Sequence, residues 1–296
     1  MKELRSILVV LDKPKHAQTA LERARKLAQA AGAHMHLVSF CWLAMAEQES
    51  VFDTHQRRAL KQGAIHEREA WLRNLILDAG LSAADVSTEV AWTADIAGWV
   101  ADYAREKNVD LVVKSIRHRS GTLLRKPIDW QLLRSCQAPL LLTDSRERIR
   151  TGKVLATIDL RHTDEKHQHM NRQVLAAAQT MTKLLDGELA CSHVVESVHL
   201  PPGVNIMAEG ELIEQAREQL TAVLEATVAA DAMAQSTLHV VVGTVGSALN
   251  ELVDREGIEM VVVGSSARRG LAGAVLGNTA ERILSKVDSD LLAVHP

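Results

Sequence analysis

The stretch from Val261 to Arg282, VVVGSSARRGLAGAVLGNTAER, carries the residues of this chain that are best suited to hold an anion. Gly264 follows an apolar run directly, and Gly277, Asn278 and Thr279 open a predicted helix whose free backbone N–H groups can hold a phosphate. The stretch is not a Walker loop, because no G-K-[ST] ends it. It is not the GxGxxG of dinucleotide-binding folds either, because that pattern follows a first strand and this loop follows a fourth.

The other candidate groups for chemistry are weaker. His162, His167 and His169 are close in sequence, but the last two are two residues apart and do not share one face of a helix. We expect solvated histidines and predict no metal site. No serine, cysteine or carboxylate pair stands beside a histidine in a pattern typical of a nucleophile or a general acid and base, so no catalytic group is predicted.

The elements that position the loop form two copies of one α/β domain. Buried strands and amphipathic helices alternate, and the pattern restarts after the polar segment 144–152. The first strand of each copy is similar: SILVVLD from Ser6 to Asp12 matches KVLATID from Lys153 to Asp159. A chain of 296 residues is about twice the size of one comfortable core. We therefore predict domains at residues 1–146 and 152–296.

Each half is predicted to be a doubly wound, five-stranded parallel sheet with helices on both faces. In the first half we predict strands at 6–12, 35–40, 86–92, 111–113 and 140–143, and helices at 17–31, up to 77, at 94–107 and at 130–134. In the second half we predict strands at 153–159, 189–195, 236–242, 260–263 and 290–294, and helices ending at Gly187, at 211–230, at 248–256 and from Gly277.

Ligands of such folds bind beyond the carboxyl ends of the strands, which locates the candidate site from topology alone. Asp12 and Asp159 each end a first strand, so each is predicted to lie at the binding edge of its own half. The alternative is that these aspartates only cap a turn or a helix.

At the glycine-rich stretch the sequence resembles the universal stress protein family, whose nucleotide-binding members carry GxxG, nine residues, then G[ST] at this place. Gly264, the nine residues from Arg268 to Leu276, and Gly277 fit this spacing. Two positions differ: Ala267 stands for the second glycine, and Asn278 follows Gly277, with Thr279 next. The segment KPIDWQLLRSC, residues 126–136, resembles tandem members of the family, so the resemblance covers the whole chain.

The resemblance implies a site in the second half for ATP or a related adenine nucleotide, with or without Mg²⁺, and slow ATP hydrolysis at most. Asp159 would contact the adenine, the backbone of Val194 would face the base, and Gly243 would line the ribose. The residues implied at the phosphates are Gly264, Gly277, Asn278 and Thr279, with Arg268 and Arg269 supplying charge-assisted hydrogen bonds. The alternative is a relic loop with solvated arginines.

The corresponding loop of the first half, from Lys114 to Gly121, has no glycine directly after the strand. No nucleotide is predicted there. Lys114, Arg117, His118 and Arg119 are able to bind an anion, but we expect them to be solvated surface charges.

Composition excludes several classes of function. A net charge of −3 and only five Trp, two Phe and one Tyr give no footprint for nucleic acid. Three isolated cysteines argue against a disulfide framework or a structural zinc site and favour a reducing compartment. No apolar stretch approaches the roughly 20 residues that span a bilayer, and no signal peptide precedes the first strand. We predict a cytoplasmic protein.

Three functions stay open. The first is a stress-response sensor or regulator that binds nucleotide in its second half. The second is an interaction protein with decayed sites, whose halves form an intramolecular pseudo-dimer through the strands 140–143 and 291–294, with or without a further homodimer of chains. The third is a carrier of a small apolar or amphipathic metabolite, lined by the apolar segments Cys41–Ala46 and Leu200–Met207.

Overall fold

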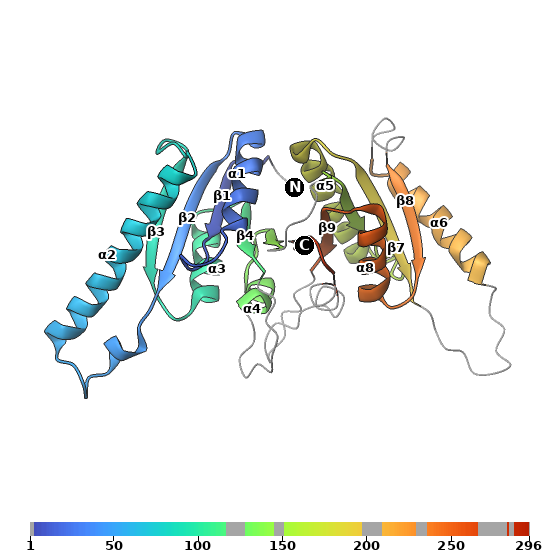
Figure 1. Ribbon diagram of the computed structural model, residues 1–296. Coiled ribbons are helices and arrows are strands. Elements are labelled where there is room, and N and C mark those ends of the chain that lie inside the picture. Colours follow the sequence, from blue (N-terminus) through green and yellow to red (C-terminus); the bar gives the residue numbers. More distant parts are fainter. Residues whose placement is uncertain are drawn as a thin grey trace. The chain divides into compact units, whose positions relative to one another are not determined.

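The computed structural model describes residues 3–116, 128–144, 151–196, 209–228, 236–265, 283 and 287–295. The chain divides into two compact units, one of Lys2–Ser145 and the other of Arg146–Pro296 with Met1 (Figure 1). These units are called the first and the second domain below.

The first domain is a parallel sheet covered by helices. Its described strands are β1 (Ser6–Val10), β2 (His34–Cys41), β3 (Val86–Trp92), β4 (Leu111–Ser115) and β5 (Leu140–Thr143), in the order β3-β2-β1-β4-β5. Its described helices are α1 (Thr19–Ala31), α2 (Thr54–Asp78), α3 (Ile96–Glu106) and α4 (Ile128–Ser135), with a short 3-10 helix at Ala44–Glu47.

The second domain repeats this topology. Its described strands are β6 (Val154–Thr157), β7 (Leu189–Val195), β8 (Thr237–Val242), β9 (Met260–Gly264) and β10 (Asp290–Val294), all parallel, in the order β10-β9-β6-β7-β8. Its described helices are α5 (Glu165–Leu185), α6 (Glu209–Glu225) and α8 (Val245–Glu256). The predicted α/β class with five parallel strands in each half is confirmed within the described ranges.

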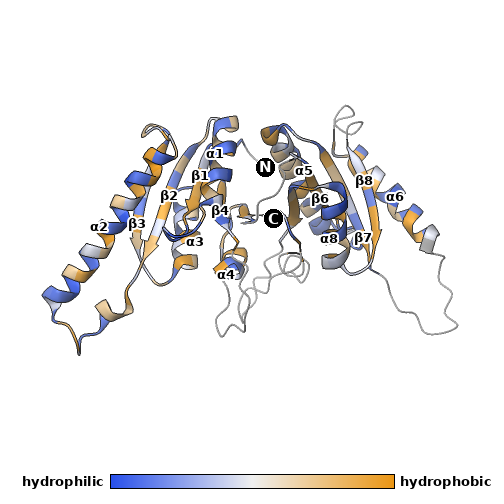
Figure 2. Ribbon diagram, viewed as in Figure 1, coloured by the Kyte–Doolittle hydropathy of each residue, from blue (hydrophilic) through white to orange (hydrophobic). Residues whose placement is uncertain are grey.

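The strand order explains which helix covers which face. Because crossovers between parallel strands are right-handed, α1 and α2 pack on one face of the first sheet, and α3 and α4, which contact each other, pack on the opposite face. Hydrophobic residues concentrate on the strands and on the helix sides turned toward them (Figure 2). The core of each domain therefore lies between sheet and helices: Val9, Leu37 and Val113 in the first and Leu155, Cys191 and Val262 in the second are fully buried.

The end of α5 corrects one prediction. Asp186, not Gly187, ends this helix in the left-handed conformation, with φ 50° and its N–H on the Lys183 and Thr182 carbonyls. Gly32 has the same role after α1, with φ 66°. Gly187 is required for another reason, because a Cβ there would overlap the carbonyl of Gly152, which lies just before β6. The glycine marks a close approach of two backbones, and sequence spacing alone does not distinguish this from a helix end.

The first helix of the second domain is longer than that of the first domain. Leu11 donates its N–H to Val38, and Ile158 donates to Ser192 at the same place, so Asp12 corresponds to Asp159. From these aspartates to the left-handed helix ends, residues 159–186 are seven longer than residues 12–32. The extra length forms helix, since α5 has 21 residues and α1 has 13. This extension carries side chains that have no counterpart in the first domain.

Other predictions meet the limits of the described residues. The helix predicted from Gly277 and the segment Leu200–Met207 lie outside them, and pairing of the two halves through β5 and β10 stays a prediction. Within the described ranges, no helix combines the length and the apolar character needed to cross a membrane.

Candidate nucleotide site and its counterpart in the first domain

Four residues that the sequence assigns to a nucleotide lie at one edge of the second sheet. Asp159 follows β6, Val194 is the next-to-last residue of β7, Gly243 follows β8, and Gly264 ends β9. These strands are neighbours in the order β9-β6-β7-β8 and are parallel, so their carboxyl ends share one edge. The topology therefore brings the four positions together where this class of fold binds ligands.

Gly243 is at a position that other residues rarely occupy. Its φ is 141°, and its N–H donates to the Val195 carbonyl over 3.0 Å. The following residue, Thr244, is the N-cap of α8. The glycine thus turns the chain sharply from strand to helix at the binding edge.

Asp159 is held by an arginine that the sequence did not single out. Arg161 donates to Oδ1 of Asp159 from its backbone N–H (3.0 Å) and from Nε (2.9 Å), and to Oδ2 from Nη2 (2.9 Å). Its Nη1 also reaches Glu196 over 3.4 Å. Burial raises the pKa of Asp159, but the hydrogen bonds and charge of Arg161 outweigh it and leave this pKa below its usual value. The carboxylate is therefore charged, oriented and only partly occupied as an acceptor.

Asp159 is not a helix cap. Its backbone N–H donates to Oδ1 of Asn171 over 3.0 Å, and the Asn171 amide donates back to the Asp159 carbonyl over 2.8 Å. The N-cap of α5 is Asp164, whose side chain accepts from the N–H of His167. In the first domain Gln18 makes the corresponding contact to the N–H of Asp12 over 3.1 Å. The carboxylate of Asp159 is therefore not consumed by capping α5.

Gly264 faces a helix side chain. A Cβ on this residue would lie 2.5 Å from Cγ and 2.7 Å from Sδ of Met170, which belongs to the extension of α5. Glycine is thus required here by close packing against α5. A phosphate that approaches the Gly264 backbone has to share this space with the Met170 thioether.

In the first domain a serine occupies the position that corresponds to Gly264. Ile116 donates its N–H to Thr143 over 2.8 Å, as Ser265 donates to Val294 over 2.8 Å, so Ser115 corresponds to Gly264. The Ser115 hydroxyl accepts from the N–H of Ala20 (3.1 Å) and from Oγ1 of Thr19 (2.9 Å) at the start of α1. One backbone N–H in the first turn of α1 is therefore hydrogen-bonded within the protein.

Lys114 differs from the prediction. It is the fourth residue of β4, only 7% exposed, and its Nζ lies 2.7 Å from Oδ1 of Asp129 in the first turn of α4. Nζ also donates to the Ser115 carbonyl over 2.8 Å. Because its charge is buried and paired, Lys114 is neither a solvated residue nor a free anion ligand. The strand extends two residues beyond its predicted end at 113, which draws Lys114 into the core. Arg117, His118 and Arg119 lie outside the described residues.

The phosphate-facing residues predicted from the sequence, Arg268, Arg269, Gly277, Asn278 and Thr279, also lie outside the described residues. Their positions stay predictions. The apolar segment predicted to line a metabolite cavity, Cys41–Ala46, exposes Trp42, Leu43 and Met45 by 44%, 37% and 46%.

The three cysteines are free thiols. Burial raises the pKa of Cys136 to about 11 and that of Cys191 to about 12. A thiol is a nucleophile only as thiolate, so these two residues are inert packing groups.

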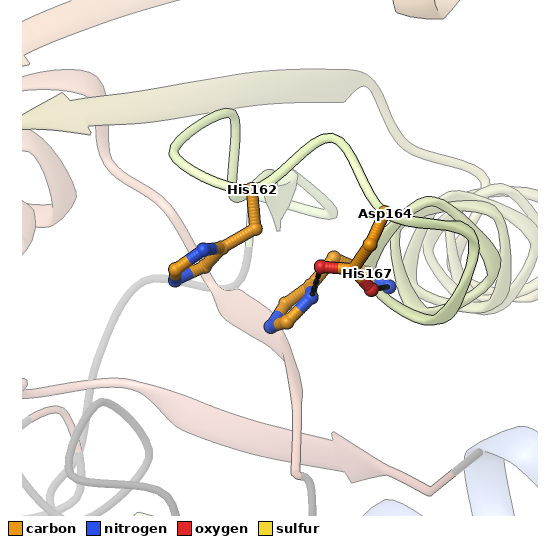
Figure 3. Close-up of side chains that lie close together, drawn as sticks. All are labelled: His162, Asp164 and His167. Carbon is orange, nitrogen blue, oxygen red and sulfur yellow. Dashed lines mark hydrogen bonds and ion pairs between the residues drawn. The ribbon is translucent and has the colours of Figure 1, made fainter.

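A second group of side chains at the binding edge was not predicted. His162, in the loop after β6, faces Asp164 and His167 at the start of α5 (Figure 3). His169, which the sequence places two residues after His167, lies outside this group, and its Nε2 contacts Gln173 over 3.3 Å. Sequence spacing within one helix could not reveal this group, because a loop residue completes it.

Comparisons with known proteins agree with the duplication. The sequence profile of the Universal stress protein family matches residues 3–144 and 153–295. The chain is 24% identical to universal stress protein E of Photorhabdus laumondii, covering 100% of this chain and 96% of that protein, and 25% identical to universal stress protein E of Salmonella typhi, covering 100% and 96%. Among solved structures, a putative universal stress protein of Pseudomonas aeruginosa is 26% identical with a TM-score of 0.69, covering 99% of this chain and 94% of that one.

Proposed function

Because the chain belongs to the universal stress protein family, we propose that it is a cytoplasmic stress-response regulator that binds ATP or a related adenine nucleotide in its second domain. The observation that carries this proposal is the gathering of Asp159, Val194, Gly243 and Gly264 at the carboxyl ends of four neighbouring strands. Two of these four have properties suited to a ligand: Asp159 is an oriented carboxylate, and Gly243 has no neighbouring side-chain atom closer than 3.5 Å to the place of a Cβ.

In the proposed complex Asp159 accepts a hydrogen bond from the nucleoside, with Arg161 as the residue that fixes its orientation. Two oxygens of a carboxylate offer about four lone-pair positions, and Arg161 uses three. The backbone of Val194 faces the base and Gly243 lines the ribose. The phosphates, with or without Mg²⁺, lie against Gly264 and the segment from Arg268 to Thr279.

The first domain is proposed to bind no nucleotide. Ser115 occupies the place of Gly264 and engages the start of α1, and the Lys114–Asp129 pair lies behind it. A phosphate would have to displace these internal hydrogen bonds, each of which contributes roughly 1 kcal/mol. The tandem therefore combines one binding domain with one that contributes packing.

The proposal is tested by calorimetric titration of the nucleotide-stripped full chain with ATP and ADP. Asp159→Asn and Asp12→Asn form a matched pair, since both aspartates follow the first strand of their own domain. We expect one site per chain, weakened about tenfold or more in D159N through loss of a charged hydrogen bond, and unchanged in D12N. Gly277→Val should abolish binding while the circular dichroism spectrum and the melting temperature stay those of the wild type.

One observation favours the second candidate function, an interaction protein with a decayed site. The longer α5 places Met170 against Gly264, and Arg161 in the preceding loop binds Asp159, so groups of the protein itself occupy both ends of the candidate site. Absence of ATP and ADP binding in the wild-type chain would overturn the nucleotide proposal and support this alternative. Equal weakening in D12N and D159N would instead assign binding to both domains and contradict the proposed asymmetry.

A further inference from the structure

The group formed by His162, Asp164 and His167 has the chemistry of a metal site. One ligand atom from each of the three residues lies within 4.8 Å of the others, and the imidazole rings of the two histidines are 4.3 Å apart. Nδ1 of His167 is 2.5 Å from Oδ2 of Asp164. Figure 3 shows the loop histidine turned toward the pair on the helix. No other group of three such side chains occurs within the described parts of the chain.

We propose that His162, Asp164 and His167 bind one divalent transition-metal ion of the zinc or cobalt type. Two imidazole nitrogens and one carboxylate oxygen are ligands that such ions prefer, whereas Mg²⁺ prefers oxygen ligands and keeps several waters. Three protein ligands leave at least one position of a tetrahedral ion for water or another small ligand. The site goes beyond the proposed nucleotide function, because no part of it depends on a bound nucleotide.

The distances fit closure around an ion. Metal–nitrogen bonds of about 2.0–2.1 Å place tetrahedral ligand atoms roughly 3.3 Å apart. From separations of at most 4.8 Å, the ligand atoms therefore have to move relative to one another by no more than about 1.5 Å. His162 and Asp164 are exposed and His167 is half-buried, so rotation of the side chains suffices. The ion takes the place of the hydrogen bond between His167 and Asp164.

Local electrostatics favour the ion on balance. The positive end of the α5 dipole opposes a cation, but this effect is weak at an exposed helix end. The Asp164 carboxylate stands at the same helix end, in contact with His167, and is itself a ligand of the ion. Direct ligation by a carboxylate therefore outweighs the opposing dipole.

The group joins two parts of the fold. His162 and Asp164 lie in the loop between β6 and α5, and His167 lies in the first turns of α5, by which this helix exceeds α1. The same loop carries Arg161, and the same turns of α5 carry Met170. The metal would therefore fix the loop that carries Arg161, next to the start of the helix that carries Met170.

Calorimetric titration of the chelator-treated, nucleotide-free full chain with ZnCl₂, CoCl₂ and MgCl₂ tests the proposal. Wild-type protein should bind one Zn²⁺ or Co²⁺ ion per chain. His162→Ala and His167→Ala should each bind this ion at least about tenfold more weakly. Mg²⁺ should not compete with it. His169→Ala is the matched control, because this histidine lies two residues beyond His167 and outside the group; it should bind as wild type. Bound Co²⁺ should give the intense visible absorption of a four-coordinate ion.

Asp164→Asn separates ligation from helix capping. Asparagine caps a helix as well as aspartate does, so the fold is kept while the charged ligand is lost. Weaker Zn²⁺ binding with an unchanged melting temperature supports the site. Zn²⁺ binding by H162A equal to that of the wild type, or no Zn²⁺ binding by the wild type, would overturn it. Neither outcome bears on ATP binding, which is measured without metal in the D159N and D12N series.

Discussion

Ser115 and Gly264 occupy the same position in the two domains, but the first domain uses a side chain there and the second has no room for one. The Ser115 side chain bonds the first turn of α1, whereas Gly264 has no side chain because Met170 of α5 fills the space. In the first domain α1 begins beside the end of β4, whereas in the second domain the longer α5 begins earlier and packs against the end of β9. This difference between duplicated domains leads to the first two predictions.

Ser115→Ala should destabilise the first domain. The N–H of the buried Ala20 loses its acceptor, which costs about 1–2 kcal/mol, as removal of a helix cap does. The midpoint of urea unfolding, followed by the fluorescence of the first-domain tryptophans, measures the loss. Ser115→Thr keeps the hydroxyl and serves as the control. An unchanged midpoint in S115A would mean that water or another group satisfies Ala20.

Gly264→Ala should destabilise the second domain by about 1–3 kcal/mol, because the new methyl group overlaps Cγ and Sδ of Met170. Met170→Ala removes the overlapping atoms. The double variant should therefore be more stable than the sum of the single effects predicts, by at least about 1 kcal/mol in a double-mutant cycle. Additive effects would show that Gly264 is needed for a reason other than this contact. Gly210→Ala, where a Cβ meets nothing within 4 Å, is the control.

Lys114→Met should be among the most damaging single changes in the first domain. It leaves the Asp129 carboxylate buried without its partner, which costs roughly 3–5 kcal/mol. Adding Asp129→Leu removes the unpaired charge, and the double variant should recover most of the loss. Chemical denaturation of the three proteins measures this. If K114M were as stable as the wild type, the pair would not be buried as described.

Asp186→Gly should stabilise the second domain by about 0.5–1 kcal/mol. Asp186 has φ 50°, a conformation that glycine adopts without strain, and its negative charge stands at the unfavourable end of the α5 dipole. Gly32→Ala is the reciprocal variant: it should destabilise α1 through the backbone alone, since a Cβ there meets nothing within 4 Å. Differential scanning calorimetry measures both. Lower stability of D186G would show that the aspartate side chain makes a compensating contact.

The Asp159–Arg161 pair predicts a pH dependence. The pKa of Asp159 is lowered in the folded protein, so the pair stabilises the fold above the unfolded pKa of about 3.9 and loses this effect as pH falls through the folded pKa. Arg161→Ala should therefore cost about 0.5–1 kcal/mol at pH 7, as expected for a half-exposed pair, and almost nothing near pH 2.

The control for this dependence is Glu196→Gln, which removes only the longer contact to Arg161. Its effect should be smaller at every pH. Urea unfolding from pH 7 down to the acid limit of the fold compares the three proteins. A difference between R161A and wild type that grows toward low pH would contradict the assignment.

The sequence by itself determined the class of fold and the place of the candidate site. β3, β5, β7 and β10 lie at the predicted residues. Leucine-rich runs such as those of β5 and β10 are typical of strands buried on both faces. The duplication and parallel strand order then put Asp159, Val194, Gly243 and Gly264 at one edge. Each of these inferences depends on short-range patterns repeated along the chain, which a sequence displays directly.

Only the tertiary structure decided what meets at that edge. Arg161 on Asp159, Met170 over Gly264, Lys114 buried against Asp129, and His162 beside Asp164 and His167 all depend on side chains from a loop, a helix or a distant strand. The reason for glycine at position 187 also came from the tertiary structure. Its place in the sequence predicted a helix end, but the close approach of the Gly152 backbone is what leaves no room for a side chain. Such contacts are set by how far a loop extends and where a helix begins, and a shift of a few residues there changes every partner while the pattern of apolar residues stays the same.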